Sequence, residues 1–212
     1  DDELRVVGLG GTKALGNVVV NTGGLINFTV AEDLILNGNL QVDGTGSITS
    51  GSGTWIFQKS GGGGTISGTA AAPAIDNASF TTSYTHSGTF SISDLSVTGT
   101  TLTNTGSLTV DTSLSGSGTL TQGSAATLTI AFAGLPTIST LNATASTNTV
   151  QYSLGGAQAI LAADYENLTL TTSGVKTFSS GTTRIANTLT IGGTATADAT
   201  TNTPTVEYNG TG

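Results

Sequence analysis

Pairs of apolar residues that flank a single, frequently hydroxylated residue recur along the whole chain. They include Val18/Val20, Leu34/Leu36, Leu40/Val42, Leu108/Val110, Leu128/Ile130, Val150/Tyr152, Leu168/Leu170, Leu189/Ile191 and Val206/Tyr208. Because successive side chains of an extended chain point to opposite sides, this alternation predicts strands with one buried face. Threonine suits the outward side, since its β-branched side chain favours extended backbone. The best helical candidate, 157–166, is short enough to be one turn in a loop, so the sequence predicts a nearly all-β protein.

Equivalent pairs return at a nearly constant spacing along the chain. The series runs through Leu108, Leu128, Val150, Leu168, Leu189 and Val206. The tetrapeptide at 149–152 recurs in similar form at 205–208, and the segment 40–43 has an echo at 108–111. A regular return of this kind is typical of a solenoid, in which each coil stacks its apolar residues on those of the next. A right-handed parallel β-helix with coils of about 20 residues is therefore the predicted fold.

A β-sandwich, such as a pilin-like subunit, is the alternative fold. A sandwich built from hairpins shows turn signals about every 8–12 residues, and Gly, Asn and Asp do punctuate the strands here. A solenoid coil also contains two or three corners, so turn residues fit both folds. The longer, regular return of the apolar pairs favours the solenoid.

We expect three regions along the chain. Residues 1–50 form N-terminal coils, residues 51–88 form irregular, loop-rich coils, and residues 89–212 form regular coils. The middle region contains the glycine run 61–64, which we interpret as a loop in a wider coil or as part of a small subdomain. Since 206–210 begins another copy of the repeat, we expect that further repeats follow or that this end stacks on another copy of the chain.

The composition excludes several functional classes. Only 8% of the residues are charged, 36% are hydrophobic, and the formal net charge is −8. Five cationic residues cannot form a stripe that binds nucleic acid or an anionic membrane surface. The chain has no cysteine for disulfides or thiolate metal sites, and no apolar run has the length of a membrane helix. This composition predicts an extracellular protein at a cell surface, and a chain without methionine is expected to be a processed protein or a fragment.

No residue is assigned a catalytic, cofactor-binding or metal-binding role. His86, the only histidine, is expected in a turn or at the surface. The alternative function of a carbohydrate-active enzyme or carbohydrate-binding module requires charged side chains that converge on one strand face. The acidic residues are instead dispersed, and Lys176 and Arg184 are the cations considered near a possible cleft. Asp43 and Asp111 occupy matching repeat positions, so a calcium ion held between them is a weaker hypothesis.

Threonines spaced by one residue suggest a further alternative, an ice-binding module. Such pairs occur at Thr127/Thr129, Thr169/Thr171 and Thr188/Thr190. An ice-binding face requires these pairs in register over several coils. Coils of unequal length would offset the pairs unless loops absorb the difference, so outward threonines are interpreted as ordinary strand residues.

The last third of the chain resembles repeats of large secreted β-helical surface proteins of bacteria, of the adhesin and filamentous-haemagglutinin type. The resemblance lies in the segments 149–152, 165–171, 174–178 and 189–193. It implies display at the cell surface and contact with other cells, surface glycans or matrix, and it carries over no functional residue. The predicted function is structural or adhesive, as a rod or filament subunit that is not an enzyme and that associates head to tail or with further repeats. No cofactor, nucleic acid or membrane insertion is expected.

Overall fold

The computed structural model describes residues 3–5, 13–28, 31–71 and 73–210. Within these ranges the secondary structure consists of strands, with no helix, and so no helix that could span a membrane. Every described strand pairing is parallel. The chain is therefore a parallel β-solenoid of about 9 turns, with coils of about 21 residues, which confirms the predicted fold class.

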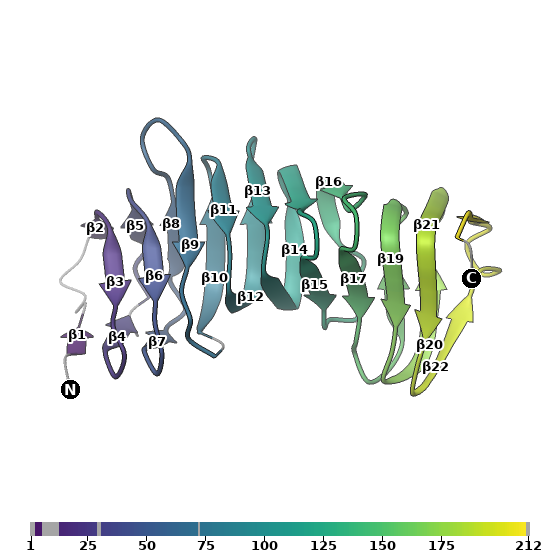
Figure 1. Ribbon diagram of the computed structural model, residues 1–212, viewed down its shortest axis with the longest axis horizontal. Helices are drawn as coiled ribbons and strands as arrows, with labels where there is room; N and C mark the ends of the chain where they lie inside the picture. Colours follow the sequence, from purple (N-terminus) through teal and green to yellow (C-terminus); the bar gives the residue numbers. More distant parts are fainter. Residues whose placement is uncertain (1–2, 6–12, 29–30, 72, 211–212) are drawn as a thin grey trace.

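Each of the first coils consists of three strands. These strands are β1 (Glu3–Arg5), β2 (Lys13–Leu15), β3 (Val18–Val20), β4 (Leu25–Phe28), β5 (Leu34–Leu36), β6 (Leu40–Val42), β7 (Ser47–Ser50), β8 (Thr54–Phe57) and β9 (Gly64–Ser67). Each strand from β1 to β6 pairs with the strand three places later, so β1, β4 and β7 stack, as do β2, β5 and β8, and β3, β6 and β9. The strands run across the long axis of the molecule, and the N- and C-terminal ends lie at opposite ends of the stack (Figure 1).

In the later coils, neighbouring strands often merge across a corner. The remaining strands are β10 (Ala74–Phe80), β11 (Tyr84–His86), β12 (Thr89–Val97), β13 (Thr101–Asn104), β14 (Ser107–Gln122), β15 (Thr127–Ile130), β16 (Thr137–Asn142), β17 (Thr149–Tyr152), β18 (Gln158–Ile160), β19 (Asp164–Leu170), β20 (Ser173–Phe178), β21 (Thr182–Ile191), β22 (Thr194–Asp198) and β23 (Thr205–Tyr208). The long strand β14 pairs with four strands, β12, β13, β15 and β16, so this single strand contributes to all sides of its coil.

We distinguish three outward surfaces of the solenoid. The groove face is the outward side of β8 and of the second halves of β10 and β12, together with the middle of β14. The His face is the outward side of β9, β11, β13 and the end of β14, continued by the end of β16, the starts of β19 and β21, and β23. The Thr face is the outward side of the starts of β12 and β14, of β15 and β17, and of the ends of β19 and β21.

Coils of unequal length stack in register because loops take up the difference. Few residues separate Ala78 from its register partner Leu95 along the chain, whereas many more separate Leu40 from its partner Ile66. The longer return contains the loop 59–63, in which Gly61, Gly62 and Gly63 all have positive φ. Strands β8 to β11 keep parallel register with their neighbours on both sides, so the segment 51–88 continues the stack as a wider coil with an inserted loop.

The interior is a set of apolar ladders, in which each inward residue lies on its counterpart one coil away. Leu108, Leu128, Val150, Leu168 and Leu189 form one such ladder, as the sequence predicts. The predicted last step is wrong, because Val206 pairs with Thr183 on a different side of the coil. The tetrapeptides 149–152 and 205–208 are thus alike without being equivalent.

Two further expectations from the sequence are corrected. The segments 40–43 and 108–111 belong to different ladders, since Leu40 stacks between Val18 and Ile66 while Leu108 stacks between Phe90 and Leu128. The helical candidate 157–166 contains β18 and the start of β19. The parallel pairing also rules out the sandwich, whose hairpins would join antiparallel strands.

Glycine is required where coils approach most closely at a corner. A Cβ atom on Gly106 would lie closer than 3.0 Å to the carbonyl oxygen of Gly88, and a Cβ atom on Gly88 would lie 2.5 Å from the carbonyl oxygen of Gly68. The backbone of one coil therefore occupies the space that a side chain would need on the next.

Candidate functional site

The interior of the His face carries a ladder of polar side chains in place of apolar ones. His86, Asn104 and Gln122 occupy consecutive rungs, after Leu40 and Ile66, and all three are buried. Nδ1 of His86 lies 2.7 Å from Oδ1 of Asn104, and Nδ2 of Asn104 donates to Oε1 of Gln122 at 2.7 Å. Asn104 Nδ2 also donates to the carbonyl oxygen of Thr127 at 2.9 Å.

These contacts define the protonation state of His86. Because Nδ2 of Asn104 donates to two acceptors, its Oδ1 is the atom that faces His86, and Nδ1 of the imidazole must carry the hydrogen. The other ring nitrogen, Nε2, is buried without a hydrogen-bond partner. Burial lowers the pKa of His86, and the hydrogen bond to Asn104 opposes this only in part. The imidazole of the folded chain is therefore neutral at neutral pH.

The expectation that His86 lies in a turn or at the surface is wrong. Its exposed fraction is 2%, because β11 directs the side chain inward in phase with Tyr84. A sequence signal did exist, since His86, Asn104 and Gln122 each follow an inward apolar residue by two positions and recur at intervals of 18. No carboxylate or hydroxyl nucleophile is hydrogen-bonded to the imidazole among the described residues, so this ladder has the form of a structural network.

Lys176 is also buried, although the sequence placed it beside a possible cleft. Its Nζ donates to the carbonyl oxygens of Leu154 at 2.5 Å and Gly156 at 3.1 Å, and to Oε1 of Gln158 at 3.1 Å. Gln158 is its partner in the strand register and in turn donates to the carbonyl oxygen of Ile130 at 2.7 Å. The ammonium thus joins two backbone carbonyl oxygens of the turn before β18 to the side chain of Gln158 on β18 itself.

Two tyrosines form a closed hydrogen-bond loop in the interior. Tyr165 donates to the carbonyl oxygen of Leu161 at 2.6 Å, and the backbone N–H of Leu161 donates to the hydroxyl of Tyr152 at 3.0 Å. The two hydroxyl oxygens are 3.1 Å apart, so Tyr152 donates to Tyr165. Burial raises the pKa of Tyr152 to about 12 and raises the pKa of Tyr165 well above its usual value. Both phenols are neutral and hold the turn between β18 and β19.

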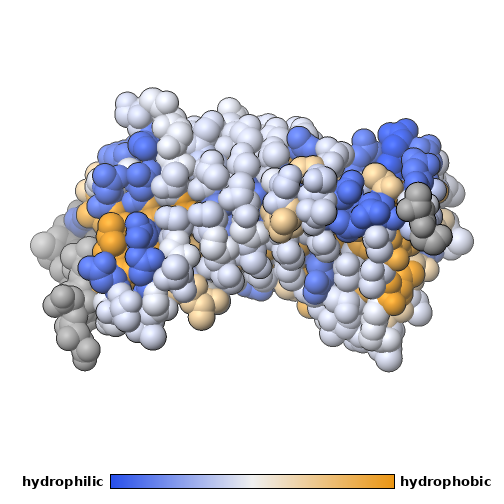
Figure 2. All heavy atoms as spheres, in the orientation of Figure 1, coloured by the Kyte–Doolittle hydropathy of each residue, from blue (hydrophilic) through white to orange (hydrophobic). Residues whose placement is uncertain are grey.

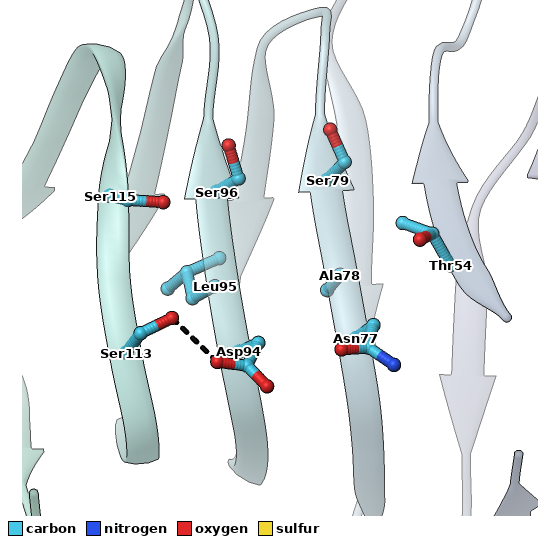
Figure 3. A pocket seen from close by; sticks show the side chains of 9 residues that line it. All are labelled: Thr54, Asn77, Ala78, Ser79, Asp94, Leu95, Ser96, Ser113 and Ser115. Atoms are coloured by element: carbon cyan, nitrogen blue, oxygen red, sulfur yellow. Dashed lines mark hydrogen bonds between the residues drawn. The ribbon is translucent and has the colours of Figure 1, made fainter. Parts of the chain in front are cut away.

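The groove face contains a shallow hollow of about 160 Å³. Short side chains line it in two rows that follow the coils: Thr54, Asn77, Asp94 and Ser113 in one row, and Ser79, Ser96 and Ser115 in the other (Figure 3). Ser113 donates to Oδ1 of Asp94 at 2.6 Å, and the amide of Asn77 donates to the carbonyl oxygen of Ser52 at 3.2 Å. Small hydroxylated residues create the hollow because they leave the sheet surface nearly uncovered.

The hollow offers hydrogen-bonding groups without a catalytic arrangement. Among the described residues that line it, Asp94 is the one ionisable residue. Hydrolysis of a glycosidic bond uses a pair of carboxyl groups, and lyase chemistry adds a base or a metal ion.

Charged residues do converge at one place on the His face. Arg184 lies between Asp164 and Glu207 on adjacent coils, with Nη1 3.5 Å from the Asp164 carboxylate and Nε 2.7 Å from that of Glu207. The two carboxylates hold the pKa of Arg184 above its usual value. The alternative function of a carbohydrate-active enzyme requires charged side chains that converge in this way on one strand face. About half of each of these three side chains is exposed, however, which is typical of a surface ion-pair ladder.

The weaker calcium hypothesis fails on geometry. Asp43 and Asp111 lie on different ladders and do not stack. Oδ1 of Asp43 accepts hydrogen bonds from Thr69, and Asp111 accepts one from Ser91. No group of three or more potential metal ligands occurs within the described ranges.

The pKa of Asp198 is lowered because its carboxylate accepts hydrogen bonds from Thr201 and Thr200 at a turn.

The Thr face presents two columns of uncharged polar residues that stay in register over six coils. One column contains Thr89, Ser107, Thr127, Thr149, Asn167 and Thr188, and the other contains Ser91, Thr109, Thr129, Gln151, Thr169 and Thr190. Eight of these twelve residues are threonine and two are serine. The loops absorb the difference in coil length, so the pairs stay in register, which is the condition that the sequence left open.

The comparisons with known proteins do not identify the chain. No protein-family model, no curated protein and no solved structure matches it.

Proposed function

We propose that the chain is a structural rod of an extracellular surface protein, which holds contact surfaces away from a cell and has no catalytic activity. The observation that carries this proposal is the parallel stack itself. About 9 turns, at roughly 4.8 Å per turn, correspond to roughly 40 Å of rod. Apolar ladders run between coils, so each coil is buried by its neighbours rather than by a separate domain.

The surface of the rod supports an extracellular location. On the face shown in Figure 2, residues of near-neutral hydropathy cover the middle of the molecule, while strongly hydrophilic residues and hydrophobic patches both lie towards its two ends. The chain has no cysteine and few charges, and it keeps its outward positions polar with threonine and serine. The resemblance to adhesin-type repeats points the same way, and on that basis contacts with glycans or other cells fall on the outward strand faces.

We further propose that the rod is extended by additional coils, from the same chain or from a second copy. At the last described coil, Ile191 and Tyr208 are 49% and 46% exposed, although earlier members of their ladders, Leu170 and Ile185, are buried. A further coil would cover them and pair with the β21 and β23 edges.

Surface labelling tests the location. Antibodies against the purified chain should label intact cells that produce it, at the same level as permeabilised cells. Labelling that requires permeabilisation would overturn the extracellular proposal.

Analytical ultracentrifugation tests extension by a second copy. Elongated oligomers should grow with concentration. A species that stays monomeric over the whole accessible range would reject self-stacking and leave further repeats of the same chain as the source of extra coils.

Catalysis is tested by incubating the protein with a panel of acidic and neutral polysaccharides. No new reducing ends or unsaturated products should form. Turnover that disappears in an Asp164→Asn or Asp94→Asn variant would overturn the non-enzymatic proposal.

A further inference from the structure

We propose that the Thr face binds ice. The ligand is the surface of crystalline water, which presents oxygen atoms at fixed repeats in two directions. The two columns of the Thr face form a similarly regular lattice of hydroxyl groups. This activity goes beyond the structural role proposed above and does not depend on it.

The backbone fixes both repeats of this lattice. Residues two positions apart on one strand are about 6.6 Å apart, and equivalent residues on adjacent parallel strands are about 4.8 Å apart. The six rungs share one register: Thr109 pairs with Thr129, and Thr169 pairs with Thr190. Each rung thus adds two hydroxyl positions at the same offsets, and water molecules held there are ordered in two dimensions as they are at an ice surface.

The coils differ in length, but the additional residues of the longer coils do not lie on this face. The returns between successive rungs are unequal, and the one from Thr127 to Thr149 is the longest, yet the twelve positions stay aligned. The irregularities in strand register fall elsewhere: between Ile92 and Asp94, between Gly116 and Thr119, and between Tyr165 and Asn167. The loops and corners therefore vary while the lattice is kept.

The side chains on this face suit ordered water better than those of the other two faces. Threonine has a stiff χ1 and presents a methyl group beside its hydroxyl, so the hydroxyl position is defined and the surface is only weakly hydrated. None of the twelve residues is charged. The groove face instead carries Asp94 and a hollow. The His face also has a column of threonines in register, Thr65, Thr85, Thr103 and Thr121, but this column is shorter and continues into Asn142 and the Arg184 ion-pair ladder.

Three residues interrupt the hydroxyl lattice, Ser91, Gln151 and Asn167. The hydroxyl of Ser91 donates to the carboxylate of Asp111, which lies beside the first rungs of the face. The amide of Asn167 donates to the carbonyl oxygen of Asn148 at 2.7 Å, so this side chain is tied to the edge of the face. Gln151 lies in the middle of its column, between Thr129 and Thr169. It is the position at which a substitution should improve the lattice.

The test compares ice binding by the purified full chain and by matched variants. Adsorption is measured as partition of fluorescently labelled protein into a slowly growing ice hemisphere, together with inhibition of ice recrystallisation. Thr129→Tyr places a bulky ring at the centre of the Thr face. Thr121→Tyr is the control, because Thr121 is an equally half-buried outward residue in the shorter threonine column of the His face, so this variant also tests whether that face is the one that binds. Thermal melts of both variants establish that the fold is retained.

The unaltered chain and Thr121→Tyr should both concentrate in ice and inhibit recrystallisation, while Thr129→Tyr should lose both effects. Gln151→Thr should strengthen them. The proposal is overturned if the unaltered chain is excluded from ice, or if both tyrosine variants retain binding or lose it equally while folded. Should Thr129→Tyr fail to fold, Thr129→Val replaces it and must weaken binding. Failure of ice binding with positive surface labelling rejects this inference and leaves the rod proposal in place.

Discussion

Oδ1 of Asn104 accepts a hydrogen bond from Nδ1 of His86 one coil away, and this contact lies inside the solenoid. Oδ1 also accepts from the backbone N–H of Gly106 at 3.0 Å, so it has a partner without the imidazole. The neighbours of His86 are Ile66 on the preceding rung and Phe90, whose ring packs edge-on at a centroid distance of 5.9 Å. The imidazole of His86 therefore has apolar groups on the sides that do not face Asn104.

The buried imidazole makes stability depend on pH near neutrality. Above pH 6.5, His86 is neutral in both states and the full stability is present. As the pH falls below 6.5, the unfolded chain binds a proton, while the folded chain does not until its lower pKa is reached. The free energy of unfolding therefore falls with decreasing pH in this window, by at most about 1.4 kcal/mol per pH unit.

Urea denaturation between pH 5 and 8 measures this dependence. His86 is the only histidine, so His86→Ile, which continues the apolar ladder from Ile66, should flatten the curve over this range. A slope that is unchanged in the variant would show that another group is responsible.

Leucine truncations test the stacking that defines the fold. Leu128 is fully buried between Leu108 and Val150, so Leu128→Ala should lower the free energy of unfolding by about 2–5 kcal/mol. Leu189 belongs to the same ladder but is only partly buried on the last described coil. Leu189→Ala should cost clearly less, as measured by chemical denaturation. Equal losses would mean that the last coil is as well covered as the centre.

The ammonium of Lys176 is expected to stabilise the fold through the oxygens it joins. Lys176→Met keeps the length of the side chain but leaves the carbonyl oxygens of Leu154 and Gly156 without this donor. Lost hydrogen bonds to a charged group predict destabilisation of about 1.5–3 kcal/mol. Val175→Ala, at the outward neighbour on β20, should change stability by about 0.5 kcal/mol or less. Similar effects of the two substitutions in thermal or urea unfolding would contradict the role given to Lys176.

The sequence predicted the strands and the coil length well because both depend on local alternation and its return. Four successive steps from Leu108 to Leu189 are correct for that reason. The step to Val206 fails because every side of the solenoid requires the same apolar-x-apolar pattern. A short strand therefore does not reveal which side it occupies, and loops of variable length remove any fixed count that would.

The interior polar groups were harder to predict. A lone histidine among serines and threonines suggests a turn, and a lysine suggests the surface. Their burial depends on partners one coil away: Asn104 for His86, and Gln158 for Lys176. These pairings become visible only once the coil register is known. The alignment of the Thr face was left open for the same reason, because it depends on loops absorbing the variation in coil length.

The close backbone approach at the corner of Gly88 and Gly106 yields the last prediction. A Cβ atom on Gly106 would lie closer than 3.0 Å to the carbonyl oxygen of Gly88, and that carbonyl accepts the strand hydrogen bond from Ser107 at 2.7 Å. Relief of the clash must move backbone, so Gly106→Ala should destabilise the fold by about 1–3 kcal/mol.

Gly16→Ala is the matched control, because nothing lies within 4 Å of a Cβ atom there. It should leave stability unchanged or slightly higher, since alanine restricts the unfolded chain more than glycine does. Thermal melts of the two variants, followed by circular dichroism, separate these outcomes. If Gly106→Ala melts with the unsubstituted chain, the coils at this corner have room to part, and the close stacking on which the rod depends is looser there than the backbone contacts indicate.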